Sequence, residues 1–186
     1  MIPYREEKIQ NAVAFFADQF RKKARKPLPQ TGLYKLLAYL DFTSLKETGR
    51  PVLGLIYKAM DMGPVPMEIY GTKKDTEKYK FQATMFGQRE GLAVIPKGIP
   101  DLDYFSNYEF ELMKRIIEIF ARSWITTSIM SDSSHQQILA WKRSYKKQKN
   151  SIIDYSLEFD GDLFSKKLEE LTFPEESYLT FRALSE

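Results

Sequence analysis

The sequence contains no cysteine and one histidine, His135, among its 186 residues. The absence of cysteine excludes disulfide bonds, thiolate nucleophiles and cysteine-bound zinc. A single histidine also leaves too few nitrogen and sulfur ligands for a typical zinc site. We therefore expect neither a metal nor a cofactor, and the lack of cysteine fits a reducing compartment.

Long apolar runs are also missing. No run approaches the roughly 20 residues that cross a bilayer as a helix. The opening residues, MIPYREEKIQ, lack the basic-then-apolar layout of a signal peptide. We expect a cytoplasmic protein with no membrane partner.

Sequence patterns of common active sites are absent as well. The nine glycines form neither a GxGxxG nor a GxxxxGK phosphate loop, and no GxSxG nucleophile elbow occurs. His135 could serve as a general base, but we favour a structural residue near a helix start whose ring is hydrogen-bonded to a neighbour. The many carboxylates leave a paired-acid site open. A binding protein is favoured over an enzyme.

Charge is balanced overall but divided along the chain. The net charge is +3, yet residues 154–176 hold eight acidic and two basic residues, so this segment carries −6 and residues 1–153 carry +9. Such a division suits two interaction surfaces, although a solvated helix face explains it equally well. Basic runs at 21–26 and 142–149, the second with Tyr145, could contact nucleic acid. Basic residues at helix ends explain them more simply, so nucleic acid is not favoured.

Apolar spacing predicts a mostly helical α+β fold: a single domain with a small antiparallel β-sheet. Helices are expected over residues 4–24, 31–45, 106–120 and 124–149, the last with a break that Ser133 or Ser134 would cap, and over 162–171. Strands are expected over 52–60, 79–86 and 92–95, with residues 87–91 as the turn of a hairpin. The two prolines of 63–66 exclude a helix interior or a central strand there.

Asp41 is unusual because it lies within the apolar stripe of the second predicted helix. A buried acid needs hydrogen-bond partners, and Tyr57 or His135 could supply them. The alternative is that Asp41 lies at the edge of the stripe, in water. The sequence does not decide between the two.

Two blocks of sequence carry a family resemblance. The first is YKLLAYLDF at 34–42, followed by Gly49-Arg50-Pro51 and, after Tyr57, by Gly63-Pro64-Val65-Pro66; the second is Ser134-His135 followed by Ala140-Trp141. In this order the blocks resemble the Panacea domain, the antitoxin SocA-like family also found in phage-associated proteins. The motif positions are Asp41, Gly49, Arg50, Pro51, Tyr57, Gly63, Pro64, Pro66, His135 and Trp141.

The resemblance implies helices around a small sheet, and an antitoxin that binds and neutralises a protein toxin. It gives the motif residues structural roles, with Asp41, Tyr57 and His135 expected in or beside one polar cluster of the core. One branch of the family is similar in fold but delivers its toxin to a protease, so a protease adaptor is the alternative function. A nucleic-acid-binding regulator is a further alternative.

The sequence departs from the family in three places. Ser44 stands where many members have a histidine, the helix after Pro66 is cut short near Gly71, and the acidic segment from Asp154 has no counterpart. We therefore predict a Panacea-like domain over 1–153 and an extension over 154–186 that packs on it or on a partner. The aromatic residues expected to contact the partner are Phe159, Phe164, Phe173, Tyr178 and Phe181.

Overall fold

The structure is a computed structural model, and it describes residues 2–73 and 75–184. The described residues form seven α-helices, which makes the protein a mostly helical α+β domain, as predicted. In chain order the elements are α1 Arg5–Ala24, β1 Leu28–Pro29, α2 Gln30–Thr48, β2 Tyr57–Met60, β3 Gly63–Pro66, α3 Met67–Thr72, β4 Tyr79–Phe86, β5 Arg89–Pro96, α4 Asn107–Phe120, α5 Thr127–Gln137, α6 Leu139–Lys147 and α7 Phe173–Ala183. Three short 3₁₀ turns, η1 Tyr155–Glu158, η2 Leu163–Ser165 and η3 Leu168–Glu170, lie between α6 and α7.

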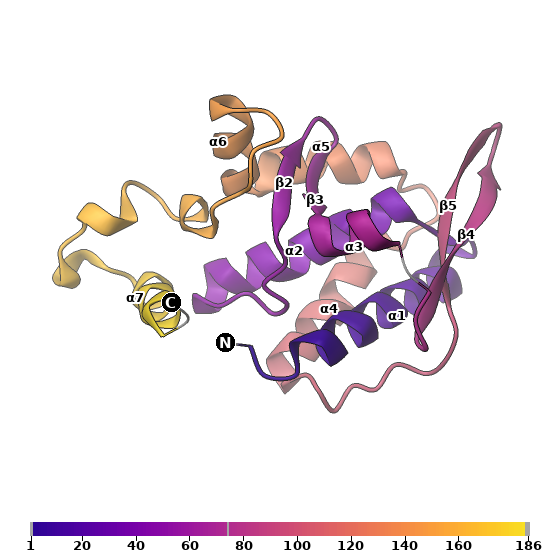
Figure 1. The fold of residues 1–186 in the computed structure, drawn as a ribbon, viewed down its shortest axis with the longest axis horizontal. Helices are drawn as coiled ribbons and strands as arrows, with labels where there is room; N and C mark the ends of the chain where they lie inside the picture. The colour runs from indigo at the N-terminus through magenta and orange to yellow at the C-terminus, as the bar shows by residue number, and fades with distance from the viewer. Residues whose placement is uncertain (1, 74, 185–186) are drawn as a thin grey trace.

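Helix α2 is the centre of the fold (Figure 1). Thirteen of its 19 residues are buried. It is therefore enclosed on all sides, whereas a surface helix buries one stripe. Elements from both ends of the chain pack on it, including α1, α4, α5 and α7.

The strands form two small antiparallel sheets. One has the order β1-β5-β4, and the other is the hairpin of β2 and β3. The prolines of β3 fit because β3 is an edge strand, where a missing amide costs no ladder hydrogen bond. The β4–β5 hairpin turns at Gly87-Gln88, a shorter turn than predicted. Gly87 has a φ of 64°, which glycine adopts at little cost.

Two expected elements are wrong. Residues 52–56 are not strand, because the amides of Leu53, Gly54 and Leu55 bond to the Asp41 side chain and not to a neighbouring strand. Residues 162–171 form only η2 and η3. The Asp162 side chain there accepts from the Phe164 amide and the Ser165 hydroxyl, a local pattern that competes with helix.

Helix ends follow the sequence signals closely. Ser106 and Glu109 form the predicted capping box of α4. Thr126 caps α5 by accepting a hydrogen bond from the Ile129 amide. The break before α6 falls at Ile138, not at Ser133 or Ser134, and Ser134 lies inside α5. Within the described residues, no helix is both long enough and apolar enough to cross a membrane.

Gly49 allows α7 to pack against the end of α2. It terminates α2 in the left-handed conformation, with a φ of 78°, and its amide donates to Leu45 O. A Cβ at this position would lie 2.1 Å from the carbonyl oxygen of Pro174 in α7. Position 49 therefore requires glycine both for its backbone angle and for the close approach of α7.

We predict that Gly49→Ala lowers the free energy of unfolding by more than the ~1–2 kcal/mol that left-handed strain costs an alanine. The additional loss comes from the displaced α7. Chemical denaturation followed by circular dichroism measures it.

Gly87→Ala is the matched control, because Gly87 also has a positive φ but has no atom within 4 Å of an added Cβ. Gly87→Ala should lower the free energy of unfolding by no more than the backbone strain alone costs. Equal losses for the two variants would contradict the packing role of Gly49.

Candidate functional site

The carboxylate of Asp41 organises the family motif. Asp41 is fully buried, and its two oxygens accept hydrogen bonds from the amides of Leu53 at 2.6 Å, Gly54 at 3.2 Å and Leu55 at 3.1 Å. Burial raises the pKa of Asp41, while the three amides oppose that rise because they bind the carboxylate form. Asp41 thus holds residues 53–55 against α2, so it is the core anchor and not a solvated residue.

Two tyrosines complete this centre. The hydroxyl of Tyr57 donates to Asp41 Oδ2 at 3.1 Å. The hydroxyl of Tyr155 shares its single hydrogen between Leu55 O, at 2.7 Å, and the same Asp41 oxygen, at 3.2 Å. Burial, followed by the charge of Asp41, raises the pKa of both tyrosines well above its usual value. Both therefore remain neutral donors. Phe42 stacks on the Tyr155 ring at a centroid distance of 5.0 Å and closes the centre on that side.

The turn after α2 uses backbone and hydroxyl groups. Ser44, where many family members have histidine, donates from its hydroxyl to Arg50 O at 2.7 Å. The backbone of Arg50 is thus bonded within the turn, although Arg50 as a whole is exposed. The next residue, Pro51, is buried. The serine therefore has a turn-forming role in this chain.

Gly63, Pro64 and Pro66 form strand β3, which passes close to α2 and α5. A Cβ on Gly63 would lie 2.9 Å from Lys35 Nζ and 2.7 Å from Ser134 Oγ. Lys35 is 2% exposed, and within residues 2–73 and 75–184 its ammonium has one hydrogen bond, to Pro64 O at 3.3 Å. Burial lowers the pKa of Lys35 to about 7. A cation with so few partners destabilises the fold while it is charged.

His135 and Trp141 form part of a stacked row on α5 and α6. The ring of His135 stacks on the Trp141 ring at a centroid distance of 4.0 Å, and the Trp141 ring stacks on Tyr145 at a centroid distance of 4.8 Å. The indole of Trp141 donates to Met60 O at 3.1 Å, and the Tyr145 hydroxyl donates to Asp61 at 2.8 Å. The row therefore fixes the turn between β2 and β3 against the helices.

The structure does not place His135 in the Asp41 centre. It brings Asp41 and Tyr57 together, but His135 lies in the last turn of α5, and no hydrogen bond described in the structure links it to Asp41. Burial, and then the positive charge of Lys35, lowers the pKa of His135. Its Nε2 is buried with no hydrogen-bond partner among the described residues, whereas a hydrogen bond between the ring and the Met62 backbone partly opposes the fall in its pKa. The position near a helix start is also wrong.

The five aromatic residues of the C-terminal segment have different environments. Phe159 and Tyr178 are buried and pack on each other at a centroid distance of 5.3 Å. This contact connects the end of η1 to α7. These two are not available on the surface, in contrast to the expectation. Phe164 is 56% exposed and Phe173 is 74% exposed. Phe181 is partly buried in the wall of a groove with a volume of about 640 Å³.

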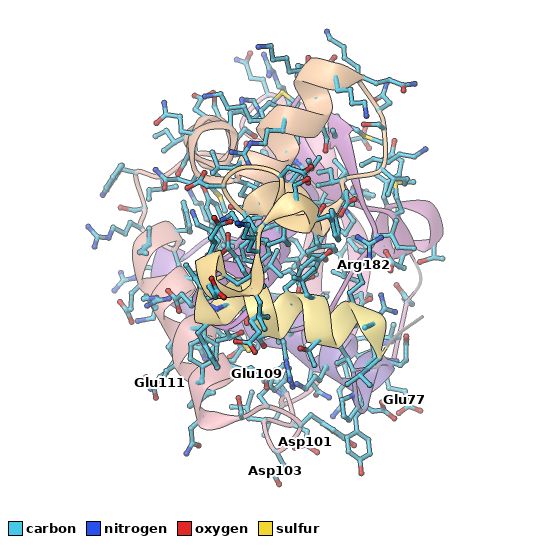
Figure 2. The ribbon with its side chains drawn as sticks, turned by 90° about the vertical axis from the view of Figure 1, so that its left-hand side faces the viewer. Glu77, Asp101, Asp103, Glu109, Glu111 and Arg182 are labelled. Carbon is cyan, nitrogen blue, oxygen red and sulfur yellow. The ribbon has the colours of Figure 1, made fainter. Side chains whose placement is uncertain are left out.

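Figure 2 looks onto this C-terminal segment, with α7 lying across the near face of the molecule. Arg182 is a residue of α7, and Asp101 and Asp103 project from the loop below that helix. The segment is attached at several points besides Tyr155. One of them is Glu158, which is 2% exposed and accepts from the Ala140 amide at 2.8 Å.

Three residues of these clusters were missed by the sequence analysis: Lys35, Tyr155 and Glu158. No local pattern marks Tyr155, because its partner Asp41 is 114 residues away in the chain. Lys35 has a weak signal, since it lies between the apolar positions of an almost entirely buried helix. Among the residues described, no three histidine, aspartate or glutamate side chains are grouped closely enough to hold a metal ion.

Comparison with known proteins gives one match. The model of the family described as antitoxin SocA-like, Panacea domain, matches residues 33–142. That range is more than half of the 186 residues and includes every motif position named above. The resemblance drawn from the sequence is confirmed. No curated protein and no solved structure matches the chain.

We predict that Asp41→Asn lowers the free energy of unfolding by about 2–4 kcal/mol. The amide keeps the shape of the side chain but replaces one acceptor oxygen with a donor, which leaves buried amides or hydroxyls without a partner. Urea denaturation measures the loss. Asp103→Asn, at an exposed position, is the control and should change stability by less than about 0.5 kcal/mol.

We also predict that stability depends on pH through Lys35. Its folded pKa of about 7 is below the ordinary value of 10.5, so the unfolded chain binds more protons between these two pH values. Stability should therefore rise with pH across this window, with a slope of up to about 1.4 kcal/mol per pH unit from this residue.

Lys35→Met should remove that slope and raise the free energy of unfolding at pH 6 by about 1–4 kcal/mol. Urea denaturation at a series of pH values measures both effects. Lys147→Met removes an exposed lysine and should give a curve close to that of the wild type. A variant at position 35 with an unchanged slope would rule out this role.

Proposed function

The chain belongs to the antitoxin SocA-like family that carries the Panacea domain, and from this premise we propose that it neutralises a cognate protein toxin by binding it directly. Family membership suggests the antitoxin role. The observation that supports binding is that polar groups of the motif residues make their hydrogen bonds within the protein. Asp41, Tyr57 and Trp141 direct their polar groups to partners inside the fold. Contacts with a toxin would then come from other parts of the surface.

We propose that the C-terminal extension, residues 154–186, supplies those contacts. Its large apolar side chains that are mostly exposed include Phe164, Leu168 at 75% and Phe173. Exposed apolar groups that lie close together in a chain are typical of protein interfaces, and aromatic residues are enriched among the strongest contacts. All three lie outside the stretch that matches the family, where partner-specific contacts are expected.

Charge supports the same surface. Residues 154–176 carry a net charge of −6. An acidic surface accelerates association with a basic partner and favours it over other proteins. A toxin that acts on nucleic acid or nucleotides would present such a basic site, and occlusion of that site is the mechanism that we propose.

The extension is also held in place before any partner binds. The Tyr155 hydroxyl donates to Leu55 O at 2.7 Å, and the Lys166 ammonium lies 2.5 Å from Glu175. Thr172 and Glu175 form a capping box at the start of α7. An ordered surface loses less entropy on binding, so small apolar contacts contribute more to affinity.

We predict that the double variant Phe164→Ser/Phe173→Ser weakens toxin binding by at least about 100-fold, since two aromatic contacts of this kind are worth roughly 2 kcal/mol each. It should also lose the rescue of growth when it is co-expressed with the product of the neighbouring gene. Pull-down and colony counts measure the two effects.

Ile99→Ser is the matched control, because Ile99 is 88% exposed but lies in the loop before α4. It should bind and rescue as the wild type does. A double variant that still binds and rescues would place the toxin contact elsewhere.

The protease-adaptor alternative has a different outcome in the same experiment. It predicts rescue together with a shortened lifetime of the toxin that depends on an ATP-dependent protease. Neutralisation by occupancy predicts a stable complex and an unchanged toxin level. A pulse-chase of the toxin, with and without this chain, distinguishes the two.

A further inference from the structure

Strand β4, Tyr79–Phe86, is the outer strand of its sheet. The order of that sheet is β1-β5-β4, so one side of β4 has no neighbouring strand among the described residues. Figure 1 shows the β4–β5 hairpin extending past the helices at the edge of the molecule. Gln82, Ala83 and Met85 on β4 are exposed.

The register determines which backbone groups point outward. The Lys97 amide donates to Lys78 O at 2.8 Å, which makes these two residues a hydrogen-bonded pair across the hairpin. Hydrogen-bonded pairs alternate along an antiparallel ladder. With the observed register, the even-numbered residues of β4 bond to β5, and the N–H and C=O groups of Phe81, Ala83 and Met85 face away from the sheet.

This edge has few of the features that normally prevent edge-to-edge pairing. Natural edge strands are short, or are interrupted by a bulge or a proline. The register of β4 with β5 runs without interruption over eight residue pairs, and β4 contains no proline. One charged residue, Lys80, lies in the strand. Three outward-facing amide and carbonyl pairs therefore form a template for another strand.

We propose that β4 pairs with β4 of a second copy of this chain, antiparallel and with Ala83 on the twofold axis. The two three-stranded sheets then become one sheet of six strands. The proposal does not rest on the antitoxin function, and it uses a surface separate from the C-terminal extension.

The side chains of β4 are complementary to themselves in this register. Ala83 faces Ala83 of the second copy, and Phe81 faces Met85, so the three apolar residues of each strand meet on one face. On the other face, Gln82 faces Thr84 and Lys80 faces Phe86. No like charges lie directly opposite each other, a pairing that would destabilise the sheet.

The contact is small. A single strand edge buries less than the ~1,200–2,000 Å² of a stable interface. We therefore expect dissociation in the micromolar range, on the order of 1–100 µM. The dimer should thus appear at high protein concentration and dissociate on dilution.

Cross-linking through an introduced cysteine tests the axis, and the absence of native cysteine makes the result unambiguous. In a hydrogen-bonded pair the two Cα atoms of position 83 would be about 5.5 Å apart, within the range that a disulfide spans. Ala83→Cys should therefore give a disulfide-linked dimer under mild oxidation.

Met85→Cys is the control. Met85 is 60% exposed, but its two copies would be roughly 14 Å apart, because they are offset by four residues. It should cross-link at least tenfold less than Ala83→Cys. Equal cross-linking of both variants, or none for Ala83→Cys, would overturn the proposed register.

Sedimentation equilibrium provides the second test. Ala83→Pro removes an amide that the β4–β5 ladder does not use, and Ala83→Lys places two positive charges on the axis. Both variants should keep the wild-type circular dichroism and weaken the dimer at least tenfold.

A wild-type chain that stays monomeric throughout this concentration range would overturn the proposal. So would protection of the β4 amides from hydrogen exchange only when the toxin is bound, because that result would assign the edge to the toxin.

Discussion

The fold depends on one buried carboxylate that must receive hydrogen bonds from several directions. Asp41 accepts from three consecutive amides after α2, from Tyr57 on β2 and from Tyr155 beyond α6. Because a buried carboxylate without donors is very unfavourable, these segments must come together for α2 to be buried at all. A single residue thereby couples the central helix, a loop, a hairpin and the C-terminal segment.

This coupling separates the interior of the protein from its surfaces. Three motif residues, Asp41, Tyr57 and Trp141, have their polar groups bonded within the fold. Gly49 and Gly63 permit a close approach of neighbouring segments. The C-terminal extension presents exposed apolar groups, and the β4 edge presents unpaired backbone groups.

Local signals in the sequence predicted much of the fold, while long-range polar contacts could not be predicted. The Ser106–Glu109 capping box and the leucines of α2 act within a few residues, and both were identified correctly. Residues 52–56 resembled a strand because they are mostly apolar, but the amides of Leu53 and Leu55 bond to a side chain in α2. The possible hydrogen bond between His135 and Asp41 is not found, because the spacing of residues in the sequence does not show where a residue of another helix lies relative to α2. For Lys35, the only indication of burial was the weak one given by its place between the apolar positions of α2.

The sequence separation between Asp41 and Tyr155, 114 residues, also matters during protein synthesis. A ribosome produces α2 and its carboxylate long before it produces the tyrosine that completes the hydrogen bonds, and α7, which covers the end of α2, is produced later still. Until then the nascent chain holds a partly satisfied acid and an uncovered apolar helix end, features that chaperones and proteases recognise in incomplete proteins. The enclosure of α2 is therefore completed only after η1 and α7 have left the ribosome.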